Sequence, residues 1–397
     1  MLKRFLQFVI LDLAAWVCLS SALLAQSPPE VMKAVEEGQK AVFRLDFEEA
    51  ERIFRRLKSE HPRRPEAYGM LTTVKLNQLL FAAKNLALDD YATPTPFTKQ
   101  PTYKNVQEER VAFLKSVQQL EDFCDRGLAG DPDNVLLLYF KGVGYENLAT
   151  EALAVRKDTG SAQKFGRRAR NLHERVLELR PGLVDANMSL AVHEFAAATL
   201  PWRIKWLAFL LGIRGNKERA LERLQLVSEK GIYRSRDAQV LLALLQAWKG
   251  DPSVAARIFR DLRRDFPQNF LSDINLAAVY ELLLNDPKKA LEVYRELLSN
   301  LEVKAPGIRP AEVHYRIGQT YLQLGEYSRA MEAFEKAVQE PHTEEETHPL
   351  AYFHMAQIHE RRGETEQARE KYRQVLRYKG PEDLLEDQLE EARKKIR

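Results

Sequence analysis

One spacing of small and large residues recurs along the chain and limits what it can fold into. A glycine or alanine is followed twelve positions later by alanine, sixteen later by an aromatic residue and nineteen later by an apolar residue. Two antiparallel helices cross closely only where the facing side chains are small, and large side chains then fill the gap to the next pair. The pattern therefore predicts repeated helical hairpins. The five copies are Gly38, Ala50, Phe54 and Leu57; Ala243, Ala255, Phe259 and Leu262; Ala278, Ala290, Tyr294 and Leu297; Gly318, Ala330, Phe334 and Ala337; and Ala356, Ala368, Tyr372 and Val375.

Turn and stop signals bound the predicted helices. The segments GDP at 250–252, NDP at 285–287, GEY at 325–327 and GET at 363–365 lie between the two helices of a hairpin and hold turn and cap residues. Prolines follow the second helices and end them. Runs of β-branched residues with alternating polarity are scarce, so we expect almost no sheet.

With these features the chain resembles the tetratricopeptide repeat (TPR) family, whose units are about 34 residues long. The resemblance implies an all-α fold, a TPR-type α-solenoid of about eight antiparallel helix pairs. The repeat pattern is clear at 31–64, 236–300 and 311–381 and degenerate between these segments. We therefore expect TPR-like repeats over 26–300, with insertions near 90–105, 150–166 and 200–215, two well-matched units over 301–381, and a charged capping helix over 382–397.

The N-terminus has the order of a secretory signal peptide: two cations, an apolar stretch, and small residues before a polar segment. A retained anchor is the alternative, because residues 5–25 have the length of about 20 residues that spans a bilayer. Asp12 would cost about 2.5–3.5 kcal/mol near the middle of such a span. We expect a signal peptide over 1–25, cut after Ala25 or Ala22, and export to the periplasm or cell envelope.

Charge and cysteine content exclude some classes of partner and of stabilisation. Lys and Arg total 60 against 57 for Asp and Glu, a net charge of +3. A nucleic-acid-binding face usually produces a basic excess, so we expect no nucleic-acid partner. Of the two cysteines, Cys18 lies in the predicted signal peptide, which leaves Cys124 alone. The exported chain then has no internal disulfide, and helix packing must supply its stability.

Catalytic signatures are absent from the sequence. We find no G-x-S-x-G elbow, no phosphate-binding G-x-x-x-x-G-K-[ST] loop, no G-x-G-x-x-G and no paired-cysteine motif. The stretch HTEEETH at 342–348 holds two histidines and three glutamates, which can bind metal ions, but their spacing matches no known ligand pattern and favours a solvated turn. We expect no enzyme, no cofactor and no metal site.

The resemblance also implies where a partner binds. In TPR proteins the first helix of each unit lines a concave groove at its second, fifth, ninth, twelfth and thirteenth positions. In this chain those positions mix amides with aromatics, which suits hydrogen bonds to an extended backbone and flat apolar contacts; alternatively, the same side chains solvate the face or pack between units. The predicted partner-binding residues are Gln39, Asn275, Tyr315, Gln319, Gln323, Phe353, Gln357 and Arg361.

Two segments do not fit the repeat. Residues 90–105 contain three prolines and form either a loop that binds a partner or folds over the groove, or a long connection. Residues 200–215, LPWRIKWLAFLLGIRG, are apolar on nearly all sides with interspersed cations. Burial in a lengthened hairpin is the expected state of such a helix. Docking in a membrane interface through Trp202, Trp206 and Phe209 is the alternative.

From these features we expect an exported, non-enzymatic scaffold that binds a protein or peptide through its concave face, in an envelope assembly. The alternative is a membrane-peripheral structural protein that docks through residues 200–215. The sequence leaves the identity of the partner and the oligomeric state open.

Overall fold

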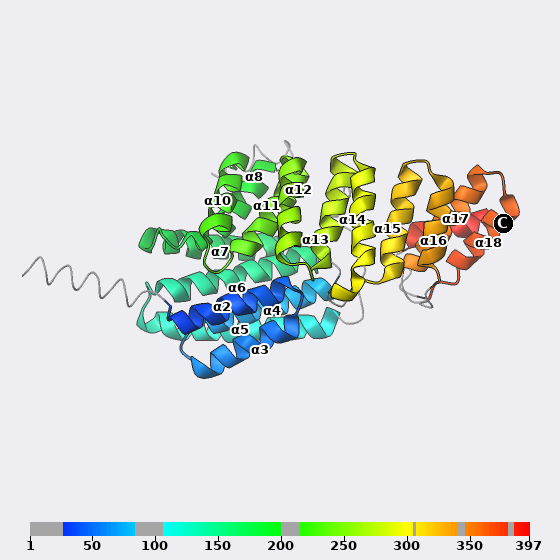
Figure 1. Ribbon diagram of the computed structural model, residues 1–397. Coiled ribbons are helices and arrows are strands. Elements are labelled where there is room, and N and C mark those ends of the chain that lie inside the picture. The colour runs from blue at the N-terminus through cyan, green and yellow to red at the C-terminus, as the bar shows by residue number, and fades with distance from the viewer. Residues whose placement is uncertain (1–26, 84–105, 200–214, 305–306, 340–345, 380–384) are drawn as a thin grey trace, which may run out of the picture.

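The computed structural model describes residues 27–83, 106–199, 215–304, 307–339, 346–379 and 385–397. This part of the chain is helical throughout, with seventeen α-helices and no strand (Figure 1). The all-α expectation is confirmed, and so is the number of hairpins, because the described helices form eight antiparallel pairs and one final helix.

Each pair joins two helices that are consecutive in the described chain. A 3-10 turn, η2, at Val184–Ala186 precedes α8, and another, η4, at Leu301–Val303 follows α14. The pairs are α2 (Pro29–Phe43) with α3 (Phe47–Glu60), α4 (Pro65–Ala82) with α5 (Val106–Gly130), α6 (Val135–Ala154) with α7 (Thr159–Leu179), α8 (Asn187–Thr199) with α10 (Lys217–Lys230), α11 (Ser235–Lys249) with α12 (Pro252–Asp265), α13 (Phe270–Ala278) and η3 (Val279–Leu283) with α14 (Pro287–Ser299), α15 (Pro310–Gln323) with α16 (Tyr327–Ala337), and α17 (Thr347–Arg361) with α18 (Thr365–Val375).

The recurring small residue makes room for the aromatic residue sixteen positions later. A Cβ atom added to Gly318 would lie 2.5 Å from the Phe334 ring, and one added to Gly38 would lie 2.2 Å from the Phe54 ring. Both rings are almost fully buried. The crossing therefore pairs a small residue on the first helix with a flat ring on the second, which explains why the spacing recurs.

In four of the five copies of the spacing, a left-handed residue ends the first helix seven positions after the small residue. Gly325 and Gly363 each have φ of +75°, and Asn285 has φ of 49°. Leu45 takes the same conformation in the first pair, with φ of 62°. The left-handed conformation ends a helix by turning its last carbonyl groups toward new donors, and it favours glycine or asparagine.

The residues of the insertion predicted near 150–166 lie mostly in helices. α6 has 20 residues and α7 has 21, whereas α17 and α18 have 15 and 11. Asp158 caps α7 by accepting the Ser161 N–H. The chain thus takes up additional length as extra helical turns, and the connection between α6 and α7 stays short.

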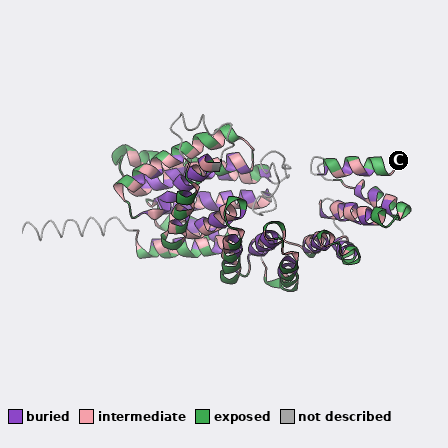
Figure 2. Cartoon of the chain, turned by 90° about the horizontal axis from the view of Figure 1, so that it is seen from above, coloured by how far each residue is buried: buried purple, intermediate pink, exposed green. Residues whose placement is uncertain are grey.

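The first helices of the chain pack against a distant part of it. In Figure 1, α2 to α6 lie across the lower left, and the helices from α12 to α18 stand in a row that leads to the C-terminus at the right. Figure 2 shows this row from above, where it follows a curve away from the N-terminal block, with buried residues between neighbouring helices. The turn before α11 contacts α2, and the turn before α13 together with the first residue of α13 contacts α2 and α4.

We call this contact the seam and define it by Gln39, Phe43 and Phe81 on one side and by residues 231–234 and 266–270 on the other. The Phe43 and Phe266 rings lie 5.4 Å apart, and the Phe81 and Phe270 rings lie 6.1 Å apart. Asn269 also donates to the Phe43 carbonyl at 2.9 Å. Since no periodicity links residues about two hundred positions apart, the repeat spacing does not predict the seam.

The last described helix, α19 (Glu386–Lys395), covers the end of the array. Leu389 and Ala392 of this helix are buried in one apolar cluster with Phe353 and Tyr372. Lys395 pairs with Glu360 at 2.8 Å. The polar side of α19 faces solvent, as the end of a stacked array requires.

Candidate functional site

A lane of aromatic and amide side chains runs along the first helices of the last two pairs, α15 and α17. Tyr315 is half-buried, and its ring lies 6.0 Å from the His354 ring at an interplanar angle of 27°. The Tyr315 hydroxyl lies 3.4 Å from His354 Nε2, and His354 Nδ1 lies 3.2 Å from Gln357 Oε1. His354 therefore links two predicted partner residues, although it was not itself predicted. Its pKa is lowered, first by burial, so the ring is neutral at pH 7.

Three further predicted residues on these two helices leave polar groups accessible, and we count Gln319 and Arg361 as part of the lane. Gln319 is half-buried, and Gln323 and Arg361 are exposed at the C-terminal ends of α15 and α17. The Arg361 guanidinium lies 5.4 Å from the centre of the Tyr327 ring, which is itself exposed. Arginine and tyrosine with accessible faces are typical of protein-binding surfaces.

Phe353, Asn275 and Gln39 are placed differently from the expectation. Phe353 is 6% exposed and packs edge-on against Tyr372, because α19 closes this end of the array. Asn275 is 4% exposed. Gln39 donates to the Tyr233 carbonyl across the seam. Phe353 and Asn275 are buried and the Gln39 amide is engaged across the seam, so we leave all three out of the candidate surface.

The predicted membrane contacts Trp202, Trp206 and Phe209 lie outside the described residues, as do the proline-rich stretch 90–105 and the signal peptide 1–25. Most of the HTEEETH stretch is also outside. Among the helices that the structure describes, none combines the length and apolar composition needed to cross a bilayer.

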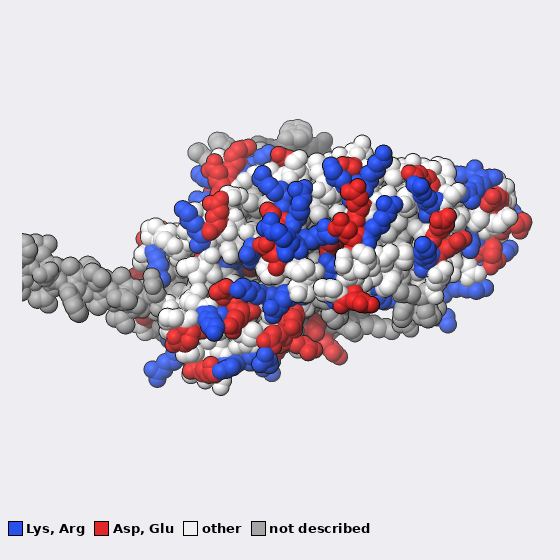
Figure 3. Space-filling model, in the orientation of Figure 1, with Lys and Arg blue, Asp and Glu red and all other residues white. Residues whose placement is uncertain are grey.

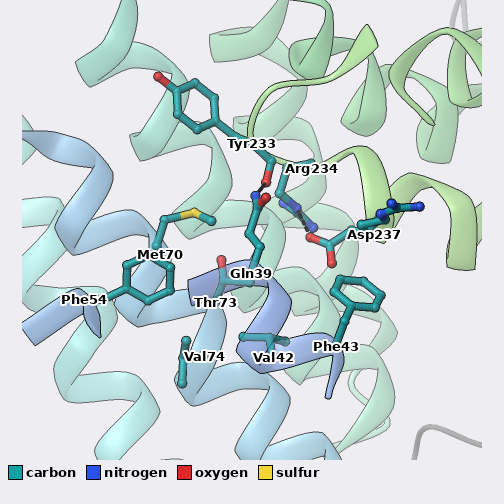
Figure 4. Close-up of a pocket in the computed structure, with 11 residues that line it drawn as sticks. Gln39, Val42, Phe43, Phe54, Met70, Thr73, Val74, Tyr233, Arg234 and Asp237 are labelled. Carbon is teal, nitrogen blue, oxygen red and sulfur yellow. Dashed lines mark hydrogen bonds and ion pairs between the residues drawn. The ribbon is translucent and has the colours of Figure 1, made fainter. Parts of the chain in front are cut away.

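A buried polar cluster fixes the turn before α11 at the seam, and Figure 4 draws its Tyr233, Arg234 and Asp237 side chains. Asp185, 1% exposed, accepts the backbone N–H groups of Ile232, Tyr233 and Arg234 at 2.8–2.9 Å. Burial raises the pKa of Asp185, and these three bonds oppose that rise. The Arg234 side chain pairs with Asp237. These bonds and this ion pair tie the turn to η2 and α11, which indicates a structural role.

Glu146, His173 and Ser189 superficially resemble a catalytic triad within this cluster. However, His173 Nδ1 lies both 2.7 Å from Ser189 Oγ and 3.3 Å from Glu146 Oε1, and His173 Nε2 faces the Tyr139 carbonyl at 3.0 Å. A triad needs the nucleophile and the carboxylate on opposite ring nitrogens. His173 is also fully buried, so the arrangement joins α6, α7 and α8 without presenting a nucleophile.

The cavity at the seam is too small for a metabolite. Its volume is about 20 Å³, and its lining includes Gln39, Met70, Thr73 and Arg234 (Figure 4). That space holds about one water molecule, whereas small-molecule sites measure about 300–1,000 Å³. In the described parts of the chain, no group of three or more His, Cys, Asp or Glu side chains is placed to hold a metal ion.

Charges of both signs alternate over the face drawn in Figure 3. Many are paired one helical turn apart, as with Arg55 and Glu51 or Lys40 and Glu36. A surface of this kind has no broad region of one sign on that face, and it fits a protein partner better than a phosphate backbone.

Comparison with protein families identifies the repeats directly. One model described as tetratricopeptide repeat matches residues 311–340, and a second with the same description matches 237–269 and 350–378. These segments coincide with the pairs α15–α16, α11–α12 and α17–α18. The chain therefore contains tetratricopeptide repeats, a class of helical repeat that commonly mediates protein interactions. A search of curated proteins gives no match.

Solved structures of repeat proteins show a distant likeness. A tetratricopeptide repeat protein from Parabacteroides merdae is 16% identical, with coverage of 82% of this chain and 99% of that chain and a TM-score of 0.33. Yeast Tom70 is 11% identical, with coverage of 98% and 86% and a TM-score of 0.38. Likenesses at this level carry no argument about function, so the site is interpreted from its own residues.

Proposed function

We propose that this protein is an exported, non-enzymatic scaffold that binds a protein or peptide along the first helices of its last repeats. The lane formed by Tyr315, Gln319, His354, Gln357 and Arg361 supports the proposal. It offers two amides for hydrogen bonds to an extended backbone and flat rings for apolar contacts. The Phe334 ring packs 5.9 Å from the Tyr315 ring and 5.5 Å from the His354 ring, and such packing lowers the side-chain entropy lost on binding.

The site chemistry favours binding over catalysis. In the polar cluster at the seam, the His173 ring is engaged by Ser189 and the Tyr139 carbonyl, and the cavity beside the cluster has room for about one water. Tetratricopeptide repeats are found in proteins that bind other proteins, and three matched segments lie in the described chain. Export, cleavage of residues 1–25 and a place in an envelope assembly are parts of the proposal that rest on the N-terminal sequence alone.

Affinity capture tests the proposal. The chain from Gln26 onward is used as bait in an envelope extract, beside a variant with Tyr315→Ala, Gln319→Ala, Gln357→Ala and Arg361→Ala. A control variant carries Glu332→Ala, Glu335→Ala and Gln367→Ala, all exposed on the second helices. We expect the first variant to lose a partner that the control retains. Equal recovery by all three baits would overturn the assignment of the surface.

A second candidate function is peripheral membrane docking through residues 200–215. The mixture of Trp202, Trp206 and Phe209 with three cations favours it, because this composition suits a membrane interface. Flotation with liposomes tests this candidate. Trp202→Glu with Trp206→Glu is expected to abolish flotation while far-ultraviolet circular dichroism stays unchanged, and flotation that persists in this variant would exclude it.

A further inference from the structure

Three large exposed apolar side chains lie at the same edge of two successive helix pairs. Trp248 is 45% exposed, Leu282 is 50% exposed and Leu283 is 37% exposed. Trp248 belongs to the last turn of α11, and both leucines belong to η3, which ends the first helix of the next pair. They therefore lie at the edge where first helices turn into second helices, the upper edge in Figure 1.

The local fold keeps these side chains outside the core. Residues 279–283 are wound as a π-helix, in which the Leu284 N–H bonds to the Val279 carbonyl at 3.0 Å. Leu284 packs against the core, whereas Leu282 and Leu283 face solvent. Trp248 has one neighbouring ring, that of Phe195, at 6.0 Å. Apolar side chains exposed together on successive repeats indicate an interaction surface.

The segments that carry these apolar side chains also carry lysines. We define the turn edge as residues 215–217, 248–251 and 282–289, which hold the four lysines Lys217, Lys249, Lys288 and Lys289 and two aspartates. Asp251 and Asp286 are N-caps, accepting backbone N–H groups from Ser253 and Lys289. The Lys249 ammonium lies 5.4 Å from the Trp248 ring centre. The Lys289 ammonium pairs with Asp286 at 2.8 Å, and the Lys217 ammonium donates to the Lys249 carbonyl at 3.2 Å. Four lysines against two aspartates still leave the turn edge with a net positive charge, which is complementary to an anionic surface.

We propose that the turn edge docks on an anionic phospholipid surface, with Trp248, Leu282 and Leu283 entering the headgroup region and the lysines facing lipid phosphates. Tryptophan and lysine beside leucine suit the interface between headgroups and acyl chains. The lipid is favoured over a peptide because exposed apolar side chains and lysines occur together at the helix ends of two successive pairs, which suits a flat anionic surface. This inference does not depend on the partner lane, and it uses only described residues.

Vesicle flotation tests the turn edge. The chain from Gln26 onward, which contains every described residue, is mixed with vesicles of phosphatidylcholine alone or with 30% phosphatidylglycerol. The apolar variant combines Trp248→Glu, Leu282→Glu and Leu283→Glu. Its matched control combines Val111→Glu and Val303→Glu, each 56% exposed elsewhere in the fold. A charge variant combines Lys249→Gln, Lys288→Gln and Lys289→Gln, which are exposed and leave the core intact.

We expect the parent and the control to float with the anionic vesicles, and the apolar and charge variants to lose at least about tenfold in partition coefficient, a change of about 1.4 kcal/mol. In a Trp202→Phe, Trp206→Phe background, emission from Trp248 should shift to the blue and be quenched by brominated lipid. The proposal is overturned by absent flotation, by equal binding to neutral vesicles, or by flotation that depends on Trp202 and Trp206 but not on the turn edge. If the apolar variant fails to fold, the charge variant and the quenching measurement decide.

Discussion

Gly318 has no room for a methyl group, because the Phe334 ring lies against it. We expect Gly318→Ala to lower the free energy of unfolding by about 1–3 kcal/mol, the usual range for overpacking a core. Gly166 lies in α7 with nothing within 4 Å of an added Cβ. Gly166→Ala should therefore raise the free energy of unfolding by about 0.5–1 kcal/mol. Urea unfolding measures both, and equal effects at the two sites would contradict the packing argument.

The buried Cys124 thiol and Tyr233 hydroxyl should make the folded chain less stable at alkaline pH. Burial raises the pKa of Cys124 and of Tyr233, each to about 12, from ordinary values of 9.0 and 10.0. Between about pH 9 and pH 12 the unfolded chain loses these protons while the folded chain keeps them. Unfolding is then favoured as pH rises, and the stability present below pH 9 is lost through this window.

Urea unfolding between pH 8 and pH 11 measures this loss. Cys124→Ala should make the free energy of unfolding fall less steeply with pH. In the native protein, the Cys124 thiol should resist Ellman's reagent at pH 8 until urea unfolds the chain. Rapid labelling of the native protein would contradict the burial of Cys124.

Sequence position does not fix the exposure of a residue in a repeat. Tyr315 and Phe353 occupy the same fifth position of their helices, yet Tyr315 is half-buried and Phe353 is closed off by α19. Gln39 follows the same positional rule and is engaged by Tyr233, about two hundred residues away. A repeat pattern predicts which face a side chain is on, but the neighbour that covers that face depends on the rest of the fold.

At the scale of helices, the sequence predicts pairing well because pairing is local. One hairpin contains the small residue, the alanine twelve positions later and the aromatic residue. Their spacing in the sequence therefore predicts how the two helices cross. The sequence also shows one irregularity: Tyr280 comes one position earlier than Tyr321 in its repeat. The structure has a π-helix at that place, and the equivalent arginines of the preceding helices, Arg260 and Arg295, still bond the two tyrosine hydroxyls.

Asn269 makes two hydrogen bonds, one that caps α13 and one that crosses the seam. Its Oδ1 accepts the Leu271 N–H at the start of α13, and its Nδ2 donates to the Phe43 carbonyl. Asn216 caps α10 alone, by accepting the Arg219 N–H. We expect Asn216→Ala to cost about 1 kcal/mol and Asn269→Ala to cost about 1 kcal/mol more. If urea unfolding gives equal values, the bond across the seam contributes nothing to stability.

At the scale of the whole molecule, the seam joins the first pairs to the middle of the array. Its contacts connect residues about two hundred positions apart, and no spacing in the sequence links them. The hairpins were therefore predictable, and the way the array folds back on its first helices was not. The seam engages Gln39 but leaves Gln319 and Gln357 of the lane partly exposed.

Opening the seam should change the shape of the molecule without melting its helices. Phe43→Glu places a charge against the Phe266 ring, and an unpaired charge is costly in an apolar contact. We expect a larger radius of gyration by small-angle X-ray scattering with helicity retained. Glu36→Gln, on an exposed position of the same helix, serves as the control and should leave the radius unchanged. An unchanged radius in Phe43→Glu would show that the seam does not hold the two parts together.

Site-specific photo-crosslinking tests the proposed binding role most directly. Benzoylphenylalanine is introduced at Gln319 or Gln357 in the lane, and at Glu332 or Gln367 on the second helices. In cells, the account predicts crosslinks to the same partner protein from the two lane positions and none from the other two. Crosslinks to that partner from Glu332 and Gln367, with none from the lane, would contradict the account.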